Sequence, residues 1–370
     1  MIIGLLKEPT HETRISLLPE HVAIIQKMNA QLLIEYGAGE KAFASDDAYL
    51  AAGATAASRQ EVLSKADVLL SINPIEASEA SSLPQKTLIG FYQPLYQKEL
   101  MQQYASAGIT VFSMDMLPRT TRAQSMDVLS SQANIAGYKA VLLAANTYPK
   151  YFPMFMTAAG SIPPAKMLIL GAGVAGLQAI ATAKRLGAVV EVFDTRPAVK
   201  EEVMSLGAKF VEVEGAADAS KAGGYAVEQS EEFIQRQKNK IAESVAKADI
   251  VITTAQIPGK KAPVLITEAM IAQMKSGSVI IDLAAATGGN TELTKNNETI
   301  SYKGISIVGN SYLAGSMPSD ASKMYGKNIL NFLQLMVSKE GQLNVQVEDD
   351  LVKGTCVAHG GALVHERLIG

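Results

Sequence analysis

Apolar residues along the first part of the chain follow two alternating patterns. Runs of four or five apolar residues, typical of buried strands in a parallel sheet, alternate with stretches in which apolar positions recur at helical spacing. We expect strands at 2–6, 31–35, 68–72, 87–91 and 110–112, and helices at 18–28, 46–52, 59–64 and 98–107. This alternation predicts an α/β fold with a doubly wound, mostly parallel sheet.

The same alternation returns in the second part of the chain. Strands are expected at 167–170, 189–193, 209–213, 250–253, 278–282 and 305–308, with a helix at 174–186. Two long helical stretches, 125–145 and 318–337, would join the two parts. The sequence therefore predicts two doubly wound domains, one made of residues 1–130 plus 315–370 and the other of residues 131–314.

A glycine-rich turn between strand 167–170 and the following helix has the spacing G-x-G-x-x-G. In such a turn the first glycine permits a tight bend, the second lets a pyrophosphate approach the backbone, and the third lets the helix pack closely on the strand. The helix start also offers N–H groups and a favourable dipole to phosphates. The predicted cofactor-binding residues here are Gly171, Ala172, Gly173, Val174 and Gly176. We therefore expect a Rossmann-like dinucleotide site, the alternative being a merely structural turn.

An acidic residue closes the next strand at the interval expected for a ribose ligand. Asp194 lies 23 residues after Gly171, counted as 194 − 171, and is followed by Thr195 and Arg196. A carboxylate at this place would repel a 2′-phosphate, which favours NAD over NADP, although the nearby Arg196 weakens that preference. We count Asp194, Thr195 and Arg196 among the cofactor-binding residues.

Composition narrows the classes of function. The chain has 370 residues, is 48% hydrophobic, carries a net charge of −3 and contains no tryptophan. These values argue against nucleic-acid binding, and a single cysteine argues against a disulfide or a structural zinc site, so we expect no metal. No apolar run approaches the roughly 18 residues of a membrane span, and the N-terminus lacks the features of a signal peptide, so we expect a cytoplasmic protein without direct membrane insertion.

A dense set of polar residues occurs at 118–131, PRTTRAQSMDVLSS. Gln124, Asp127 and Ser130 are spaced three apart, so a helix starting near residue 123 would place them on one face. Gln124 could recognise a carboxamide, and Arg119 could hold a phosphate or Asp127. The alternative is an ordinary helix start with an acid near its N-terminal dipole.

Other polar or irregular segments leave alternatives open. Residues 214–230 are rich in small residues around Tyr225 and form either a functional loop or a surface insertion. Residues 148–164 contain four prolines and are not expected to form one regular element. None of the four histidines lies near the glycine-rich turn, although His11 remains a candidate for proton transfer beside Lys7, Glu8 and Arg14.

Several segments together resemble the superfamily of alanine dehydrogenases and proton-translocating NAD(P) transhydrogenases over nearly the whole chain. They are KEPTHETRISLLPEHV, PRTTRAQSMDVLSSQANIAGYKAV, the glycine-rich turn, AQIPGKKAPVLITEAMIAQMKSGSVIIDLAAATGGN and MPSDASKMYGKNI. This set is far more specific than the glycine-rich turn alone.

The alanine dehydrogenase branch is the weaker of two alternatives. The resemblance implies that such an enzyme uses an arginine, a lysine, a histidine and an aspartate on its amino-acid substrate. Arg14 matches the arginine, but residues 68–74 contain no lysine, residues 90–94 contain no histidine, and Ala286 stands where the aspartate is expected. Three of the four groups are absent, which argues against oxidative deamination.

The transhydrogenase branch resembles the chain more closely. It implies that this chain binds NAD(H) and passes hydride to NADP(H) on a partner subunit, while membrane-spanning subunits move the proton. The candidate catalytic residues would be Arg119, Gln124, Asp127 and Ser130, which orient the nicotinamide. Ala255 and Gln256 would bind the cofactor, and the loop around Tyr225 would close over it.

The same branch implies a homodimer, with residues 151–164 at the contact between the two copies. Because the sequence contains no membrane helix, it resembles the split form of the enzyme, peripheral to the membrane through its partner subunits. The remaining alternative is a non-catalytic NAD-binding relative, which would bind nucleotide without turnover.

Overall fold

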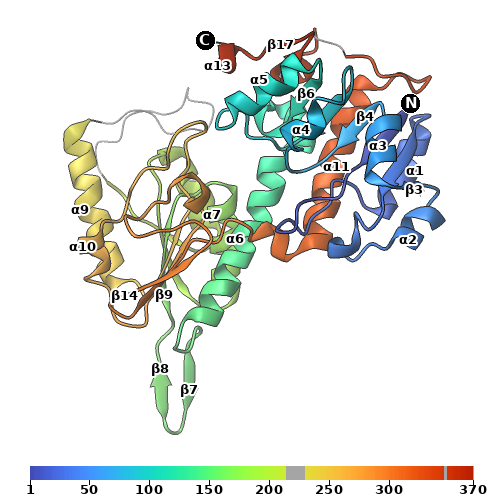
Figure 1. The fold of residues 1–370 in the computed structure, drawn as a ribbon. Helices are drawn as coiled ribbons and strands as arrows, with labels where there is room; N and C mark the ends of the chain where they lie inside the picture. Colours follow the sequence, from blue (N-terminus) through green and yellow to red (C-terminus); the bar gives the residue numbers. More distant parts are fainter. Residues whose placement is uncertain (214–229, 346–347, 370) are drawn as a thin grey trace. The chain divides into compact units, whose positions relative to one another are not determined.

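The computed structural model describes residues 1–213, 230–345 and 348–369, and these form two compact units (Figure 1). The first unit comprises Met1–Gln132 and Gly315–Gly370, and the second comprises Ala133–Ala314. One long helix, α6 (Val128–Thr147), begins in the first unit and continues into the second. Among the described residues, no helix has the length and apolar character needed to cross a bilayer.

The first unit is built on an eight-stranded sheet with the order β17-β16-β6-β5-β4-β1-β2-β3. The strands are β1 (Ile2–Leu5), β2 (Gln31–Glu35), β3 (Thr55–Ala57), β4 (Val68–Leu70), β5 (Thr87–Gly90), β6 (Thr110–Ser113), β16 (Cys356–His359) and β17 (Ala362–Leu363). The strands from β3 to β6 are parallel, whereas β16 and β17 pair antiparallel at one edge.

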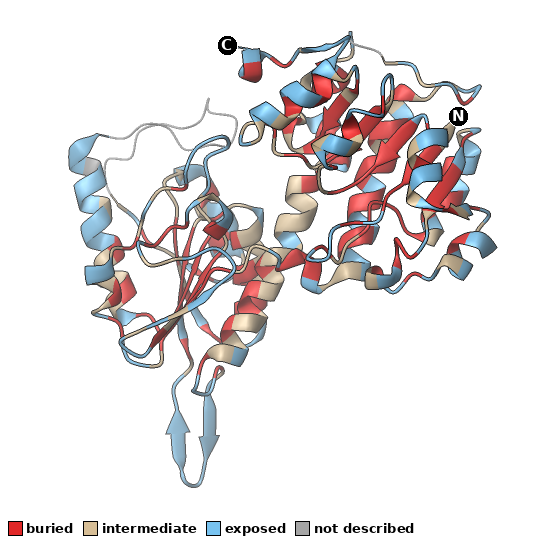
Figure 2. Cartoon of the chain, viewed as in Figure 1, coloured by how far each residue is buried: buried red, intermediate tan, exposed pale blue. Residues whose placement is uncertain are grey.

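Helices cover both faces of this sheet, which is why its central strands are buried throughout (Figure 2). The helices are α1 (Val22–Lys27), α2 (Asp46–Ala51), α3 (Arg59–Lys65), α4 (Ala77–Ala80), α5 (Lys98–Ser106), α11 (Pro318–Met336), α12 (Asp350–Thr355) and α13 (Glu366–Ile369). Val68 and Leu70 pack in the cluster that contains α11, while Leu69 packs in the cluster that contains α3 and α5. Successive residues of β4 thus point to opposite faces of the sheet and contribute to the hydrophobic cluster on each face.

The second unit contains a seven-stranded sheet with the order β11-β10-β9-β12-β13-β15-β14. The strands are β9 (Lys166–Leu170), β10 (Val189–Phe193), β11 (Lys209–Phe210), β12 (Ile250–Thr253), β13 (Val279–Asp282), β14 (Thr299–Tyr302) and β15 (Ile305–Val308). Only β14 runs antiparallel in this sheet. The helices are α7 (Val174–Arg185), α8 (Lys200–Ser205), α9 (Glu231–Lys247) and α10 (Glu268–Ile271). Residues of α6 and α7 pack on one face, and residues of α9 and α10 on the other.

Both sheets reverse their winding at one point. In the first unit, the chain winds from β1 through β2 to β3, and from β4 through β5 to β6 in the opposite direction. In the second unit, β9 and β12 flank the equivalent point. Ligands of doubly wound sheets bind outside the carboxyl ends of the strands at such a point. The predicted α/β class with two mostly parallel sheets is confirmed.

The start of the long helix differs from its prediction, and the proline-rich segment has a form that the sequence did not specify. The long helix predicted from residue 125 begins at Val128, because Thr121–Met126 forms a separate 3₁₀ helix, η4, and Asp127 lies between them. The segment 148–164, which we did not expect to form one regular element, contains a short antiparallel hairpin of β7 (Phe155–Thr157) and β8 (Gly160–Ile162). All six strand residues are exposed, and the hairpin extends away from the sheet of its unit (Figures 1 and 2).

Candidate functional site

The glycine-rich turn occupies the point between β9 and β12 where the second sheet reverses. Gly171 has a φ of +106°, and a Cβ atom there would lie 2.3 Å from Thr254 Oγ1. A Cβ atom on Gly176 would lie 1.9 Å from the carbonyl oxygen of Gly171, so the helix packs against the turn at a distance that only glycine permits. Among the residues that the structure describes, none has an atom within 4 Å of a Cβ atom built on Gly173. The backbone at Gly173 is therefore open to an approaching ligand.

Helix α7 starts directly beyond this opening. Gly173 is its N-cap and supplies no side-chain acceptor, and Val174, its first residue, is exposed. The N–H groups of a first helical turn have no partner inside the helix. Over the twelve residues of α7 they combine with the helix dipole to favour an anion. The pyrophosphate of a dinucleotide fits this arrangement.

Asp194 anchors the turn to the end of β10. Its carboxylate accepts the Ala172 N–H at 2.7 Å and the Arg196 backbone N–H at 2.8 Å. It also accepts Nε and Nη2 of Arg196 at 2.9 and 2.8 Å. This bidentate ion pair partly neutralises the carboxylate that we expect to disfavour a 2′-phosphate. Thr195 lies between the two charged residues, at the same strand end.

Ala255 and Gln256 follow β12, the neighbour of β9, and so lie at the same carboxyl edge as the glycine-rich turn. Asn290 is fully buried, accepts the Ala255 N–H at 3.0 Å and donates to the Ala255 carbonyl at 2.8 Å. Thr254 Oγ1 donates to the Gly171 carbonyl at 3.2 Å. The edge is thus held together by two residues, Thr254 and Asn290, that sequence reasoning missed.

Tyr225, the remaining predicted cofactor residue, lies outside the described residues.

The polar segment of the first unit is the second group of predicted residues. Asp127 accepts the Ser130 backbone N–H at 2.9 Å and the Ser130 hydroxyl at 2.6 Å, so its carboxylate satisfies a free N–H in the first turn of α6. Gln124 is exposed on η4 between the buried Ala123 and Met126. Arg119 is also exposed and precedes η4.

The expectation that Gln124, Asp127 and Ser130 share one face of a single helix is wrong. Gln124 lies on a 3₁₀ helix, Asp127 has an extended backbone, and Ser130 is the third residue of α6. The structure nevertheless brings Asp127 and Ser130 into contact.

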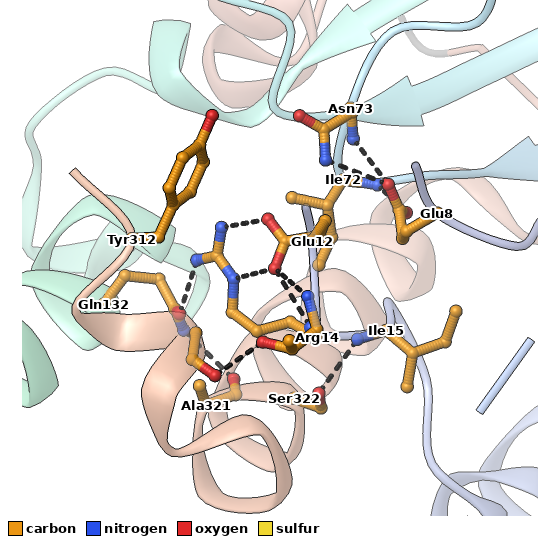
Figure 3. A network of polar contacts seen from close by, with 12 residues as sticks. Glu8, Glu12, Arg14, Ile15, Ile72, Asn73, Gln132, Tyr312, Ala321 and Ser322 are labelled. Carbon is orange, nitrogen blue, oxygen red and sulfur yellow. Dashed lines mark hydrogen bonds and ion pairs between the residues drawn. The ribbon is translucent and has the colours of Figure 1, made fainter. Parts of the chain in front are cut away.

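Charged residues line the reversal point of the first sheet, beside a cavity of about 350 Å³ (Figure 3). Glu8, which follows β1, accepts the N–H groups of Ile72 and Asn73 at 2.5 and 3.0 Å and the Asn73 side-chain amide at 3.0 Å. Burial raises the pKa of Glu8 to about 7, although these donors favour the charged form. The chain's own carboxylate thus occupies the backbone donors that follow β4.

Arg14, the match to the substrate-binding arginine of alanine dehydrogenases, is engaged within the same network (Figure 3). It donates from Nε and Nη2 to the two carboxylate oxygens of Glu12 at 2.9 and 2.7 Å, and from Nη1 to Gln132 at 2.8 Å. Burial raises the pKa of Glu12, but the Arg14 guanidinium outweighs it, so the pKa lies below its ordinary value. Arg14 therefore has a charged partner inside its own unit.

Two histidines have structural roles. Buried His21 accepts the Leu18 N–H at its Nδ1, and burial lowers its pKa. His365 bonds to the Gly354 carbonyl at 3.1 Å, and burial lowers its pKa as well. His359, by contrast, is exposed and lies 3.1 Å from Thr110 Oγ1.

Comparison with known families shows which family the chain belongs to. Residues 4–136 match the N-terminal domain of the alanine dehydrogenase/PNT family, and residues 140–366 match its C-terminal domain. The chain belongs to this family. The predicted resemblance is confirmed.

Individual relatives favour the transhydrogenase branch. The chain is 46% identical over 369 residues to an NAD(P) transhydrogenase subunit alpha chain of Rhodospirillum rubrum, covering 97% of this chain and 96% of that protein. The crystal structure of a transhydrogenase from Sinorhizobium meliloti superposes with a TM-score of 0.90 at 44% identity, covering 98% of this chain and 100% of that one. Alanine dehydrogenase of Mycolicibacterium smegmatis is 26% identical over 384 residues, covering 100% of this chain and 96% of that protein. The alpha subunits of transhydrogenase are thus the more similar relatives.

Proposed function

We propose that this chain is the NAD(H)-binding subunit of a proton-translocating transhydrogenase. The observation that carries the proposal is its similarity, along the whole chain, to transhydrogenase alpha subunits. In this role the chain passes hydride between its own NAD(H) and NADP(H) on a partner subunit. Proton movement belongs to membrane-spanning subunits, to which this chain is peripheral on the cytoplasmic side.

The ADP half of the nucleotide is assigned to the carboxyl edge of the second sheet. The N–H groups at the start of α7 bind the pyrophosphate over Gly173, where the backbone is open. Asp194 binds the ribose hydroxyls while Arg196 remains beside it. Thr195, Ala255 and Gln256 complete the cofactor-binding set. Open backbone at Gly173, with a helix start behind it, supports this assignment.

The nicotinamide half is assigned to Arg119, Gln124, Asp127 and Ser130. The bound nicotinamide supplies the chemistry, because its ring carries the hydride. Gln124, exposed on η4, has both a donor and an acceptor for a carboxamide. Asp127 and Ser130 hold each other and the start of α6, so they present a fixed polar surface. These residues act by positioning rather than by proton transfer.

Transfer of hydride between two nicotinamides explains why the usual amino-acid-handling groups are missing. Oxidation of an amine requires a residue that moves a proton. Asn73, bonded to Glu8, lies in the segment where the dehydrogenase lysine was expected, and Arg14 is paired with Glu12. The alternative of an alanine dehydrogenase is therefore disfavoured at each of these positions.

We also propose that the chain forms a homodimer through the segment 151–164. Four of its large apolar side chains, Tyr151, Met154, Phe155 and Met156, are between 40% and 72% exposed. Tyr151 and Phe155 already pack against each other in a tilted arrangement, with ring centroids 4.8 Å apart. Apolar side chains gathered on an exposed hairpin indicate a protein interface, and a second copy of this chain is the occupant that we propose.

Light scattering at micromolar concentration tests the dimer. We expect a dimer mass for the unaltered chain and a monomer mass for the Phe155→Ser/Met156→Ser variant. Val364→Ser is the matched control, because Val364 is a 43% exposed apolar residue of the first unit. A monomer mass for the unaltered chain would contradict this assignment.

An activity assay tests the function. The chain mixed with the NADP-binding subunit of a transhydrogenase should transfer hydride between NADH and NADP, whereas the chain alone should bind NADH and transfer none. Oxidation of alanine with NAD should not be detected. Turnover of alanine would support the dehydrogenase alternative, and binding without transfer in the presence of the partner would support a non-catalytic relative.

A further inference from the structure

One backbone carbonyl in the polar segment receives two side-chain amides from α11. Asn328 and Asn331 each donate from Nδ2 to the carbonyl oxygen of Ser125, at 2.8 and 2.9 Å. The two asparagines are three residues apart, so they lie on one face of α11. Ser125 lies between Gln124 and Asp127 in the sequence. We call these two side chains the amide pair.

The amide pair acts where the backbone has few partners of its own. A 3₁₀ helix of six residues is longer than the usual three or four, and its hydrogen bonds have poorer geometry. The last carbonyls of a helix also have no donor inside it. The two amide donors on the Ser125 carbonyl therefore fix the last turn of η4, directly before Asp127.

Asn328 extends this support across the junction with α6. It is 6% exposed, and its Oδ1 accepts the hydroxyl of Ser131 at 2.8 Å. A single side chain thus bonds to Ser125 on one side of Asp127 and to Ser131 on the other. The junction that carries Gln124, Asp127 and Ser130 is tied to α11 at both ends.

Apolar packing alone does not determine this geometry. Ala123 and Met126 belong to the same hydrophobic cluster as Ile329 and Phe332 of α11, which holds η4 against the helix. Such contacts are non-directional. Hydrogen bonds to one carbonyl are directional and select one rotation of η4 about its axis. At the other end of η4, Arg122 forms ion pairs with Asp349 and Asp350, but it is half-exposed and such pairs contribute little.

We propose that Asn328 and Asn331 are positioning residues for hydride transfer, which fix Gln124 and Asp127 through the Ser125 carbonyl. This inference rests on the proposed function. Without the amide pair η4 keeps its apolar contacts, but the backbone that carries Gln124 and Asp127 loses the two hydrogen bonds that orient it. A displacement of about 1 Å can reduce the rate of a positioned reaction on the order of a hundredfold.

The test uses the full-length chain in complex with the NADP-binding subunit. Asn331→Ala, Asn328→Ala and the double variant are compared with Ser319→Ala. Ser319 is the matched control, because it lies on α11 and donates to the Ala42 carbonyl at 3.1 Å, away from η4. The measurements are single-turnover hydride transfer, NADH affinity and hydrogen exchange of residues 125–131.

We expect Asn331→Ala to slow transfer roughly tenfold and the double variant about a hundredfold. NADH affinity should stay within about twofold, since the groups assigned to the ADP half belong to the other unit. Exchange of residues 125–131 should become faster in these variants, whereas Ser319→Ala should match the unaltered chain in all three measurements.

Transfer at the normal rate in the double variant would overturn the inference alone. Parallel losses of transfer, NADH affinity and thermal stability would also overturn it, because they would indicate a purely structural role. No transfer by the unaltered chain with its partner would overturn the proposed function, and the role of the amide pair with it.

Discussion

The two units share the order of their first five strands but differ at the point where each sheet reverses. In both, a central strand is flanked by the second and fourth strands of its sheet, β1 by β2 and β4, and β9 by β10 and β12. Glu8 stands three residues past β1, and Gly173 stands three residues past β9. One position holds a carboxylate bonded to the neighbouring loop, and the other holds a glycine under open space.

This difference shows that topology supplies the place for a ligand, but local residues decide which backbone donors remain for it. The donors that follow β4 already bind Glu8. At the start of α7, the N-cap is Gly173 and no side chain of the described residues caps the helix. We therefore assign nucleotide binding to the second unit and a structural role to the equivalent edge of the first.

The largest expected effect comes from closing the open edge. Gly173→Val should lower the affinity for NADH on the order of a thousandfold, about 4 kcal/mol, because the new side chain fills the space assigned to the pyrophosphate. The fold should persist, since the added Cβ meets no neighbour and φ at Gly173 is −77°. Titration calorimetry measures the affinity, and thermal unfolding checks the fold.

Gly176→Ala is the contrasting control for that experiment. A Cβ atom there collides with the Gly171 carbonyl, so this variant should lose about 1–3 kcal/mol of stability. Unchanged NADH binding in Gly173→Val would mean that the glycine-rich turn is only structural.

The edge of the first unit that carries Glu8 should respond to pH. The folded pKa of Glu8 is raised to about 7 from 4.5, so its contribution to stability is present below about pH 4.5 and is lost as the pH rises through 7. Glutamine at this position has no titrating group. Between pH 4.5 and 8 the free energy of unfolding of Glu8→Gln should therefore fall by about 3 kcal/mol less than that of the unaltered chain.

Urea unfolding at a series of pH values measures this difference. Glu76→Gln is the control, because Glu76 is an exposed carboxylate near the same loop. If Glu8→Gln and the unaltered chain show the same dependence on pH, Glu8 does not carry a proton in the folded state.

A smaller effect is expected on the choice of nucleotide. The unaltered chain should bind NADH at least tenfold more tightly than NADPH, about 1.4 kcal/mol, because of the Asp194 carboxylate. Asp194→Asn should narrow that preference. Glu191→Gln removes a charge from the same strand, where Glu191 pairs with Lys209, and should leave the preference unchanged. Equal affinities in the unaltered chain would remove the role of Asp194.

Much of the fold could be predicted because buried parallel strands leave strong apolar runs. β9, β10 and β12 lie where these runs predict them. The strands that the pattern misses, β3, β14, β16 and β17, have two to four residues, and most lie at or near sheet edges. β3, β14 and β17 are only partly buried, so they lack an apolar run, whereas β16 is buried at three of its four residues but is too short for a distinct run.

The site could be predicted only where function depends on local sequence. Gly171, Gly173 and Gly176 act within one turn, so their spacing is visible. Asn290 contacts Ala255 from 35 residues away, and Asn328 contacts Ser125 from 203 residues away. The spacing of residues along the sequence does not predict contacts over such separations. Regular spacing misplaces the start of α6, because an acid followed three residues later by serine fits a helix N-terminus as well as a helix interior.

Hydride transfer by a Gln124→Asn variant tests the central claim most directly, because it separates transfer from simple nucleotide binding. The variant is measured with the NADP-binding subunit in a single turnover, alongside its NADH affinity. Gln26→Asn, the same change elsewhere in the first unit, serves as the control. We predict a loss of transfer on the order of a hundredfold with NADH affinity changed by less than about threefold. An unchanged transfer rate would contradict the account and would leave the polar segment as an ordinary helix start.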